Sequence, residues 1–262
     1  MVIDFHTHCF PDKIAERAMA HLSHESGLIP YTDGTVSGLK SLMQQDGVDI
    51  SCVLSIATNS HQQTSVNNFA ASIACDEIVP FGSVCPDAED AIEELERIQS
   101  LGMKGVKFHP EYQAFFIDDE KMKPIYKKIS ELGLITVFHA GEDYGYMPPY
   151  HATPERIYNA LKWFDSPVIA AHWGSQGMGL QTLRHLCGIE HLYFDTAFGY
   201  ASTPKPIQQA ILEKHGTDKI LFASDCPWHA PSQDLFQLST LALTDTEREQ
   251  ILSGNARRLL NI

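Results

Sequence analysis

The chain begins with two histidines that are spaced to act together. They lie in the segment DFHTH of residues 4–8, directly after the apolar residues Val2 and Ile3. Because a β-strand points alternate side chains to opposite faces, His6 and His8 are expected to project the same way. Two neighbouring imidazoles at one strand end make half of a metal site. An isolated pair of this kind is equally compatible with two unrelated polar histidines, so the rest of the chain decides.

Three later residues also stand at the ends of apolar runs. His139, His172 and Asp225 each follow a stretch of β-branched, aromatic and small apolar residues. A single histidine at a strand end usually makes a structural hydrogen bond, but five such side chains at one rim are hard to explain structurally, because unpaired buried polar groups are costly. Imidazole and carboxylate without thiolate suit Zn²⁺, with Mn²⁺, Fe²⁺ or Co²⁺ as alternatives. The pattern predicts one divalent metal, and the residues alone do not rank His139 above His172 as its ligand.

Eight apolar runs of strand length alternate with helical stretches. The predicted strands are Val2–His6, Val48–Ser55, Ile78–Val84, Gly105–His109, Leu134–His139, Pro167–His172, His191–Asp195 and Lys219–Ser224. The predicted helices are Asp87–Leu101, Lys121–Leu132, Pro154–Phe164, Leu180–Cys187 and Pro204–Lys214. Continuous apolar strands indicate a parallel sheet that is buried on both faces.

This alternation predicts an α/β fold, a (β/α)8 TIM barrel that residues 1–262 form as a single domain. A doubly wound open sheet is the alternative. The polar residues favour the barrel, because all strand ends of a barrel converge on one mouth, where active sites are built. In an open sheet the first and last strands would lie far apart.

Composition narrows the range of partners. The net charge of −14 argues against nucleic acid and anionic lipid, since each needs a basic face. The six cysteines show no CxxC spacing, and reduced thiols are the default. The N-terminus is strand-like, unlike a signal peptide, and no apolar run approaches the ~20 residues that span a membrane. The sequence therefore predicts a cytoplasmic protein that acts on a small-molecule substrate, and a homo-oligomer is compatible with it.

The motifs, taken together, resemble those of the amidohydrolase superfamily, in the branch that includes aminocarboxymuconate-semialdehyde decarboxylase. They are DFHTH at 4–8, GVKFHP at 105–110, FHAG at 138–141, AHWG at 171–174, SDCP at 224–227 and GNARRL at 254–259. The resemblance covers the whole chain in the right order. It implies a distorted TIM barrel with one divalent metal. It also implies a ligand set and a catalytic residue: the ligands would be His6, His8, His139 and Asp225, with His172 as acid/base or electrostatic catalyst.

Lys107 has two interpretations. Binuclear amidohydrolases carry a carboxylated lysine on the fourth strand, and Lys107 lies on such a strand, two residues before His109. The simpler interpretation is an ordinary ammonium that pairs with Asp4 or Asp225 or holds a substrate carboxylate. We favour the simpler one, because this branch resembles mononuclear enzymes and one metal is sufficient to activate water.

Loops that follow the strands are expected to shape the pocket, since such loops carry specificity in barrels. The predicted substrate-binding residues are Lys107, His109, Tyr112, Gln113 and Trp228. Glu142 and Asp143 could bind a second ion or act as a base, but solvated loop charges are the favoured interpretation. The aromatic, Pro-rich segment 144–150 is interpreted as a lid. Trp173 is equally compatible with a pocket wall and with core packing.

Three functions fit these residues. The leading expectation is a metal-dependent hydrolase of the amidohydrolase type, in which a metal-activated water attacks an amide, lactone or related bond and Asp225 or His172 moves the proton. The alternative is a non-oxidative decarboxylase or hydratase of a small unsaturated or aromatic carboxylic acid. Decarboxylases of this branch are usually longer, with inserted loops, and this chain is compact. A noncatalytic metal-binding protein ranks lowest, because His172 would be superfluous there.

Overall fold

The computed structural model describes the backbone of residues 1–262 and every side chain except that of Tyr200. Within it, eight strands run parallel to their neighbours. They are β1 (Ile3–Thr7), β2 (Ile50–Leu54), β3 (Ile78–Phe81), β4 (Gly105–Phe108), β5 (Ile135–Phe138), β6 (Val168–Ala170), β7 (Leu192–Asp195) and β8 (Ile220–Leu221). Each corresponds to one of the strands that the apolar runs predict.

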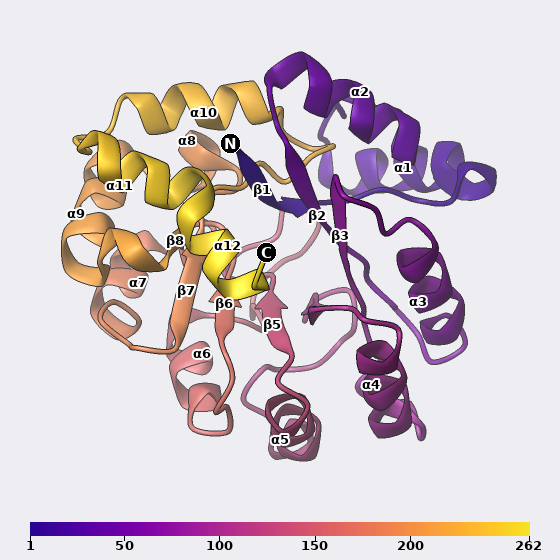
Figure 1. Ribbon diagram of the computed structural model, residues 1–262. Coiled ribbons are helices and arrows are strands. Elements are labelled where there is room, and N and C mark those ends of the chain that lie inside the picture. The colour runs from indigo at the N-terminus through magenta and orange to yellow at the C-terminus, as the bar shows by residue number, and fades with distance from the viewer.

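Two seams close the strands into a barrel. Strands β1 to β3 form one sheet and β4 to β8 a second. At one seam the amide of Gly82 donates to the carbonyl of Gly105 at 2.9 Å, and at the other the amide of Phe5 donates to the carbonyl of Phe222 at 2.9 Å. Figure 1 shows the resulting ring of strands with helices outside it, which confirms the predicted α/β barrel.

The helices include the five that the sequence predicts and several that it does not. Those predicted are α4 (Ala91–Ser100), α5 (Lys123–Glu131), α6 (Pro154–Leu161), α7 (Gly179–His185) and α9 (Lys205–His215). The others are α1 (Asp12–Ser26), α2 (Val36–Asp46), α3 (Gln63–Ser72), α8 (Gly199–Ser202), α10 (Pro231–Ser239), α11 (Asp245–Glu249) and α12 (Asn255–Leu260). The 3₁₀ turns η1 (Glu120–Met122) and η2 (Thr217–Lys219) and the π-helical segment η3 (Gln250–Gly254) complete the chain.

The interior of the barrel is a packed apolar core. Phe5, Leu54 and Val137 belong to it, and α12 adds Ala256 and Leu260. In Figure 1 the yellow α12 lies across the ring of strands, at the end where their N-termini meet. With that end covered, the carboxyl ends of the strands remain open, and the side chains that follow them form the mouth.

Seven of the eight strands are shorter than predicted, and after β6 and β8 the backbone changes direction at the residues of interest. His172 has a φ of 58° and Asp225 a φ of 71°, which no β-strand accommodates. Strand pairing therefore ends before each of them. The six cysteines are free, as expected. Among the described residues, no helix combines the length and the apolar character needed to cross a lipid bilayer.

Candidate metal centre

Three side chains from opposite ends of the chain meet at the mouth of the barrel. Oδ1 of Asp225 lies 3.3 Å from Nε2 of His6 and 3.1 Å from Nε2 of His8. The candidate ligand atoms of the three residues all lie within 4.8 Å of one another. A tetrahedral ion with bonds of about 2.1 Å would set its ligands roughly 3.4 Å apart. The spacing therefore matches that of a metal triad.

The hydrogen bonds of Nδ1 in His6 and His8 show that Nε2 of each ring carries a lone pair. Nδ1 of His6 lies 2.8 Å from Oδ2 of the buried Asp195, and Nδ1 of His8 lies 2.8 Å from the carbonyl of Leu54. Both partners are acceptors, so each Nδ1 is the donor and each neutral ring has a bare Nε2. Three acceptor atoms then converge with no proton between them. This arrangement is favourable when a cation lies among them, and the donor set fits a divalent metal.

The protonation states of His6 and Asp225 also fit metal ligands. Burial and the nearby Lys107 hold the pKa of His6 well below its ordinary value, so the ring is neutral as a ligand must be. Burial alone would raise the pKa of Asp225. The adjacent rings of His6 and His8 outweigh burial and hold that pKa well below its usual range. Asp225 is thus an anion at the centre of the triad.

Lys107 lies directly beside the triad. Its Nζ is 3.1 Å from Nε2 of His6, where the ammonium donates to the bare lone pair. The side chain is buried, and burial lowers its pKa to about 8. Among the described residues Lys107 makes no hydrogen bond to Asp4 or Asp225. Asp4 instead accepts hydrogen bonds from the amide and hydroxyl of Ser224.

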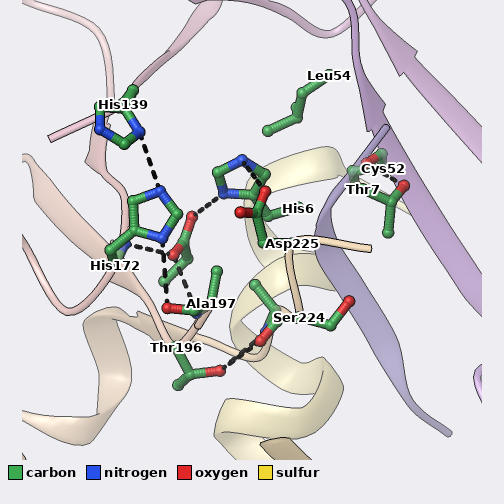
Figure 2. A network of polar contacts seen from close by, with 12 residues as sticks. His6, Thr7, Cys52, Leu54, His139, His172, Thr196, Ala197, Ser224 and Asp225 are labelled. Atoms are coloured by element: carbon green, nitrogen blue, oxygen red, sulfur yellow. Dashed lines mark hydrogen bonds and ion pairs between the residues drawn. The ribbon is translucent and has the colours of Figure 1, made fainter. Parts of the chain in front are cut away.

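His172 and His139 form a chain of hydrogen bonds beside the triad (Figure 2). Nε2 of His139 lies 3.0 Å from the carbonyl of Glu142, so it carries the proton and leaves Nδ1 as an acceptor. Nε2 of His172 lies 3.2 Å from this Nδ1, and Nδ1 of His172 lies 3.4 Å from the carbonyl of Ala197, so the neutral ring donates to one of these two acceptors. Burial, with the nearby His139, lowers the pKa of His172 to about 3, so its ring is neutral. The ring of His6 packs 5.2 Å from that of His172.

His139 also belongs to a second cluster. His109, His139 and Asp143 place their candidate ligand atoms within 4.8 Å of one another, separately from the triad. Nε2 of His109 lies 3.3 Å from Oδ2 of Asp143, and the ring of Tyr112 stacks on His109 at 3.6 Å. Asp143 is therefore mostly buried against two imidazoles, whereas a solvated loop charge was expected. That His139 is a fourth ligand of the metal, beside the triad, remains a prediction.

The side chains enclose a cavity of about 80 Å³. Lys107, His109, Tyr112 and Trp228 line it, in agreement with their predicted positions. Gln113 differs: among the described side chains it is not part of the lining, because its amide donates to the carbonyls of Ala57 and Val84 and accepts from the amide of His109. Trp173 is likewise buried in the core.

Several lining residues lie outside the motifs. They are Phe10, Leu22, Ile56, Tyr144, Gln176 and Phe198. Of these only Tyr144 lies in a segment with a sequence signal, the aromatic stretch 144–150. The others belong to loops and helix faces whose apolar residues look like ordinary core positions, so no pattern marks them.

The chain belongs to the amidohydrolase family, whose description matches residues 3–262. This confirms the resemblance that the motifs indicate. Among curated proteins, no sequence matches the chain.

Solved structures share the fold over nearly their whole length. A 5-carboxyvanillate decarboxylase from Sphingomonas paucimobilis has a TM-score of 0.78 at 15% identity, and covers 100% of this chain and 99% of its own. A 2,6-dihydroxybenzoate decarboxylase with bound 2,6-dihydroxybenzoate has a TM-score of 0.77 at 14% identity, with the same coverage. A dihydroxybenzoic acid decarboxylase from Polaromonas sp. JS666, with manganese and the inhibitor 2-nitroresorcinol, has a TM-score of 0.76 at 16% identity, covering 99% and 96%. At these identities the likeness establishes the shared fold.

Proposed function

We propose that this protein is a metal-dependent, non-oxidative decarboxylase of an aromatic or unsaturated carboxylic acid. In this reaction the bond between the carboxylate carbon and its neighbour breaks, CO₂ leaves, and the electron pair stays on the neighbouring carbon. A proton then takes the place of the carboxyl group, so no oxidant or reductant is consumed.

The observation that carries the proposal is the buried ammonium of Lys107 beside the triad. Its Nζ lies 3.1 Å from Nε2 of His6, at the bottom of a small cavity. A cation held by His6, His8 and Asp225 would stand next to it. Two positive charges in one buried recess favour an anionic substrate, because opposite charges interact strongly where water is excluded.

Hydrolysis, the leading expectation from the sequence, fits this centre less well. It needs a side chain, Asp225 or His172 in that expectation, that accepts the proton of the attacking water. Asp225 faces His6 and His8, and the resulting low pKa makes it a weak base. Burial and the nearby His139 lower the pKa of His172 to about 3, so in the free protein it is a weak base as well. The low pKa of Asp225 suits a carboxylate that serves only as a ligand.

The chain's own residues have distinct roles in the proposed reaction. A divalent ion, when bound by His6, His8 and Asp225, supplies positive charge for substrate oxygens. Lys107 holds the carboxylate. His172 is the proposed acid/base residue: its ring is neutral in the free protein, and an anionic substrate beside it would raise its pKa. The ring can then carry the proton that replaces the carboxyl group, with His139 as its hydrogen-bond partner.

The structural neighbours support this reaction class. Three of them are named as decarboxylases of aromatic acids, and one holds manganese. We therefore propose Mn²⁺ beside Zn²⁺ as the ion to load first. The aromatic side chains at the cavity, among them Tyr112 and Phe198, suit a flat ring on the substrate.

The test follows CO₂ and hydrolysis products in parallel. Protein loaded with Mn²⁺ or Zn²⁺ is incubated in D₂O with hydroxybenzoic and unsaturated acids labelled with ¹³C in the carboxyl group, and separately with lactones and amides. We expect labelled CO₂ and one deuterium on the product carbon. Lys107→Met should lower this rate by ~10²-fold, the effect of removing one preorganised charge. Exposed Lys104→Met is the matched control. Hydrolysis of lactones or amides without CO₂ from any acid would restore the hydrolase hypothesis.

A further inference from the structure

A second and much larger cavity lies beside the candidate metal centre, lined by α1 on one side and by α3 with the segment before it on the other. We call it the α1–α3 groove. Its α1 side includes Lys13, Arg17 and Leu22, and its other side includes Ile56, Val66 and Phe69. Its volume is about 930 Å³. Pockets that enclose whole organic ligands measure about 300–1,000 Å³.

The groove is continuous with the centre. His8, Phe10, Leu22 and Ile56 line both the groove and the inner cavity. The inner cavity, of about 80 Å³, has room for the reacting end of a substrate and not for a long arm. A longer arm can extend past these four residues into the groove that they border.

The charged residues that line the groove are basic, whereas the molecule as a whole is acidic. The chain carries 33 acidic and 19 basic residues, yet no Asp or Glu lines the groove in the described part of the chain. Lys13 and Arg17 lie one turn apart on α1, and both side chains are exposed. Neither forms an ion pair or hydrogen bond with any described residue. Two unpaired cations in a groove without lining carboxylates attract an anion, whereas the rest of the surface repels it, because the chain as a whole has a net charge of −14.

We propose that the α1–α3 groove binds the distal arm of an elongated substrate. This arm is apolar where it passes Leu22, Ile56 and Phe69, and it ends in a carboxylate that pairs with Lys13 and Arg17. The inference rests on the proposed function in one respect, that the reacting carboxylate lies at the triad. It adds that the preferred substrate is a dicarboxylic acid with its two acid groups far apart.

Binding of a matched ligand series tests this without turnover. The probes are para-(ω-carboxyalkoxy)benzoates of increasing arm length and the same compounds with the distal acid as methyl ester. Affinity for Mn²⁺-loaded protein is measured by calorimetry. We expect one arm length at which the free acid binds about fivefold to thirtyfold more tightly than its ester, the range that two exposed ion pairs supply. Lys13→Gln with Arg17→Gln should remove this preference and leave binding of the ester unchanged. Lys123→Gln with Lys127→Gln is the control, because these lysines lie one turn apart on α5 and are likewise exposed.

The outcomes separate the inference from the proposed function. Equal affinity of acid and ester at every arm length, or equal effects of both double variants, overturns the groove proposal even if CO₂ is released from short acids. A distal-acid preference that depends on Lys13 and Arg17 supports the groove even if no acid is decarboxylated. A second copy of the chain is the competing occupant. It would appear as a dimer that the double variant dissociates, with no effect of the distal acid, and that result also overturns the proposal.

Discussion

Two residues of the candidate centre adopt a backbone conformation that favours glycine. The φ angles are 58° at His172 and 71° at Asp225. Such a conformation costs about 1–3 kcal/mol for other residues and persists only where contacts impose it. Here the amide of His172 donates to Oδ1 of Asp195 at 2.8 Å, and the amide of Asp225 donates to the carbonyl of His6 at 2.9 Å. The strained residues are thus held by the same groups that orient the first histidine of the triad.

Replacing His172 tests whether it is a catalytic residue or a ligand. We expect His172→Ala to keep near-normal metal content and to lower the rate by ~10²-fold or more, the scale of a lost acid/base group. The reason is that His6, His8, Asp225 and His139 already complete the proposed ligand set. The measurement is elemental analysis and CO₂ release on the same preparation.

The comparison variant is His139→Ala, which should lose metal and activity together. If instead His172→Ala loses both in equal measure, the proposed roles of the two histidines are exchanged. The rings of His139 and His172 are joined by a hydrogen bond of 3.2 Å, so each ring lies close enough to take the role of the other.

A histidine far from the mouth provides a test of pH dependence. His215 is buried, stacks on Phe194 at 4.1 Å, accepts from the amide of Gly188 and donates to the carbonyl of Leu192. Burial lowers its pKa to about 4. Because this lies below the unfolded value of ~6.5, the unfolded state takes up the proton first, so stability present above pH ~6.5 is lost as pH falls toward 4.

We expect His215→Gln to abolish this part of the pH dependence. Urea unfolding at pH 7.5 should show wild type as the more stable, because the variant loses the ring that stacks on Phe194 and bridges the Gly188 amide and the Leu192 carbonyl. At pH 5 the advantage of wild type should shrink by about 2 kcal/mol. An advantage that is unchanged, or larger, at pH 5 would mean that the ring is already protonated in the folded protein.

At the scale of elements, the strands could be predicted and most of the early helices could not. Apolar β-branched runs mark all eight strands, because a strand buried on both faces needs them along its whole length. In contrast, α1 carries Lys13, Arg17 and exposed Ile14 on one side and only Ala15 and Met19 buried. Its apolar face is weak because it borders a groove. A helix that the sequence pattern does not mark is thus the one to which we assign a binding surface.

Gly105 in β4 shows how tightly the strands pack beside the centre. A Cβ at this position would collide with the carbonyl of Ile135 and the ring of Phe81. We expect Gly105→Ala to destabilise the protein by about 1–3 kcal/mol or more, the usual cost of overpacking. Urea unfolding measures it, and metal affinity should fall as well because Lys107 lies on the same strand.

Gly254 is the matched control. It has helical angles, with φ −57°, and a Cβ there would come no closer than 3.7 Å to any atom. Gly254→Ala should leave stability unchanged or raise it by up to about 1 kcal/mol, because alanine favours helices. Equal losses in the two variants would show that loss of glycine itself, and not the collision at β4, is responsible.

At the scale of the whole molecule, the sequence predicts three side chains that the structure brings together and four residues of the cavity lining, but neither the carboxylate that orients His6 nor the groove. His6, His8 and Asp225 are marked by type and by position at strand ends. Asp195, which orients His6, stands at a strand end too, but no rule distinguishes an orienting carboxylate from a ligand before the partners are known. The groove depends on residues from α1 and α3 that are ordinary in sequence, and only folding brings them to the same wall.

The last prediction concerns metal and stability together. The triad spans residue 6 to residue 225, so an ion bound there holds the first and last strands of the barrel at one point. A ligand that binds only the folded state at 100 times its Kd adds about 2.7 kcal/mol, which corresponds to a rise in Tm of roughly 5–10 °C for a chain of this size. We expect this rise when Zn²⁺ or Mn²⁺ is added to chelator-treated protein, measured by calorimetry.

Variants of two histidines separate specific binding from adventitious contacts with surface imidazoles. His8→Ala should abolish the rise in Tm, and exposed His61→Ala should leave it intact. Without metal, His8→Ala should be no less stable than the wild type, because it removes one of three acceptor atoms that otherwise crowd together without a proton between them. A variant that is less stable than wild type in the absence of metal, and equally responsive to Zn²⁺, would place the ion elsewhere and give His8 a purely structural role. A ligand is expected to show opposite effects on stability with and without metal when it is replaced. The lone pair of His8 Nε2 is repelled by the neighbouring acceptor atoms in the metal-free protein, and it bonds to the ion in the metal-loaded protein.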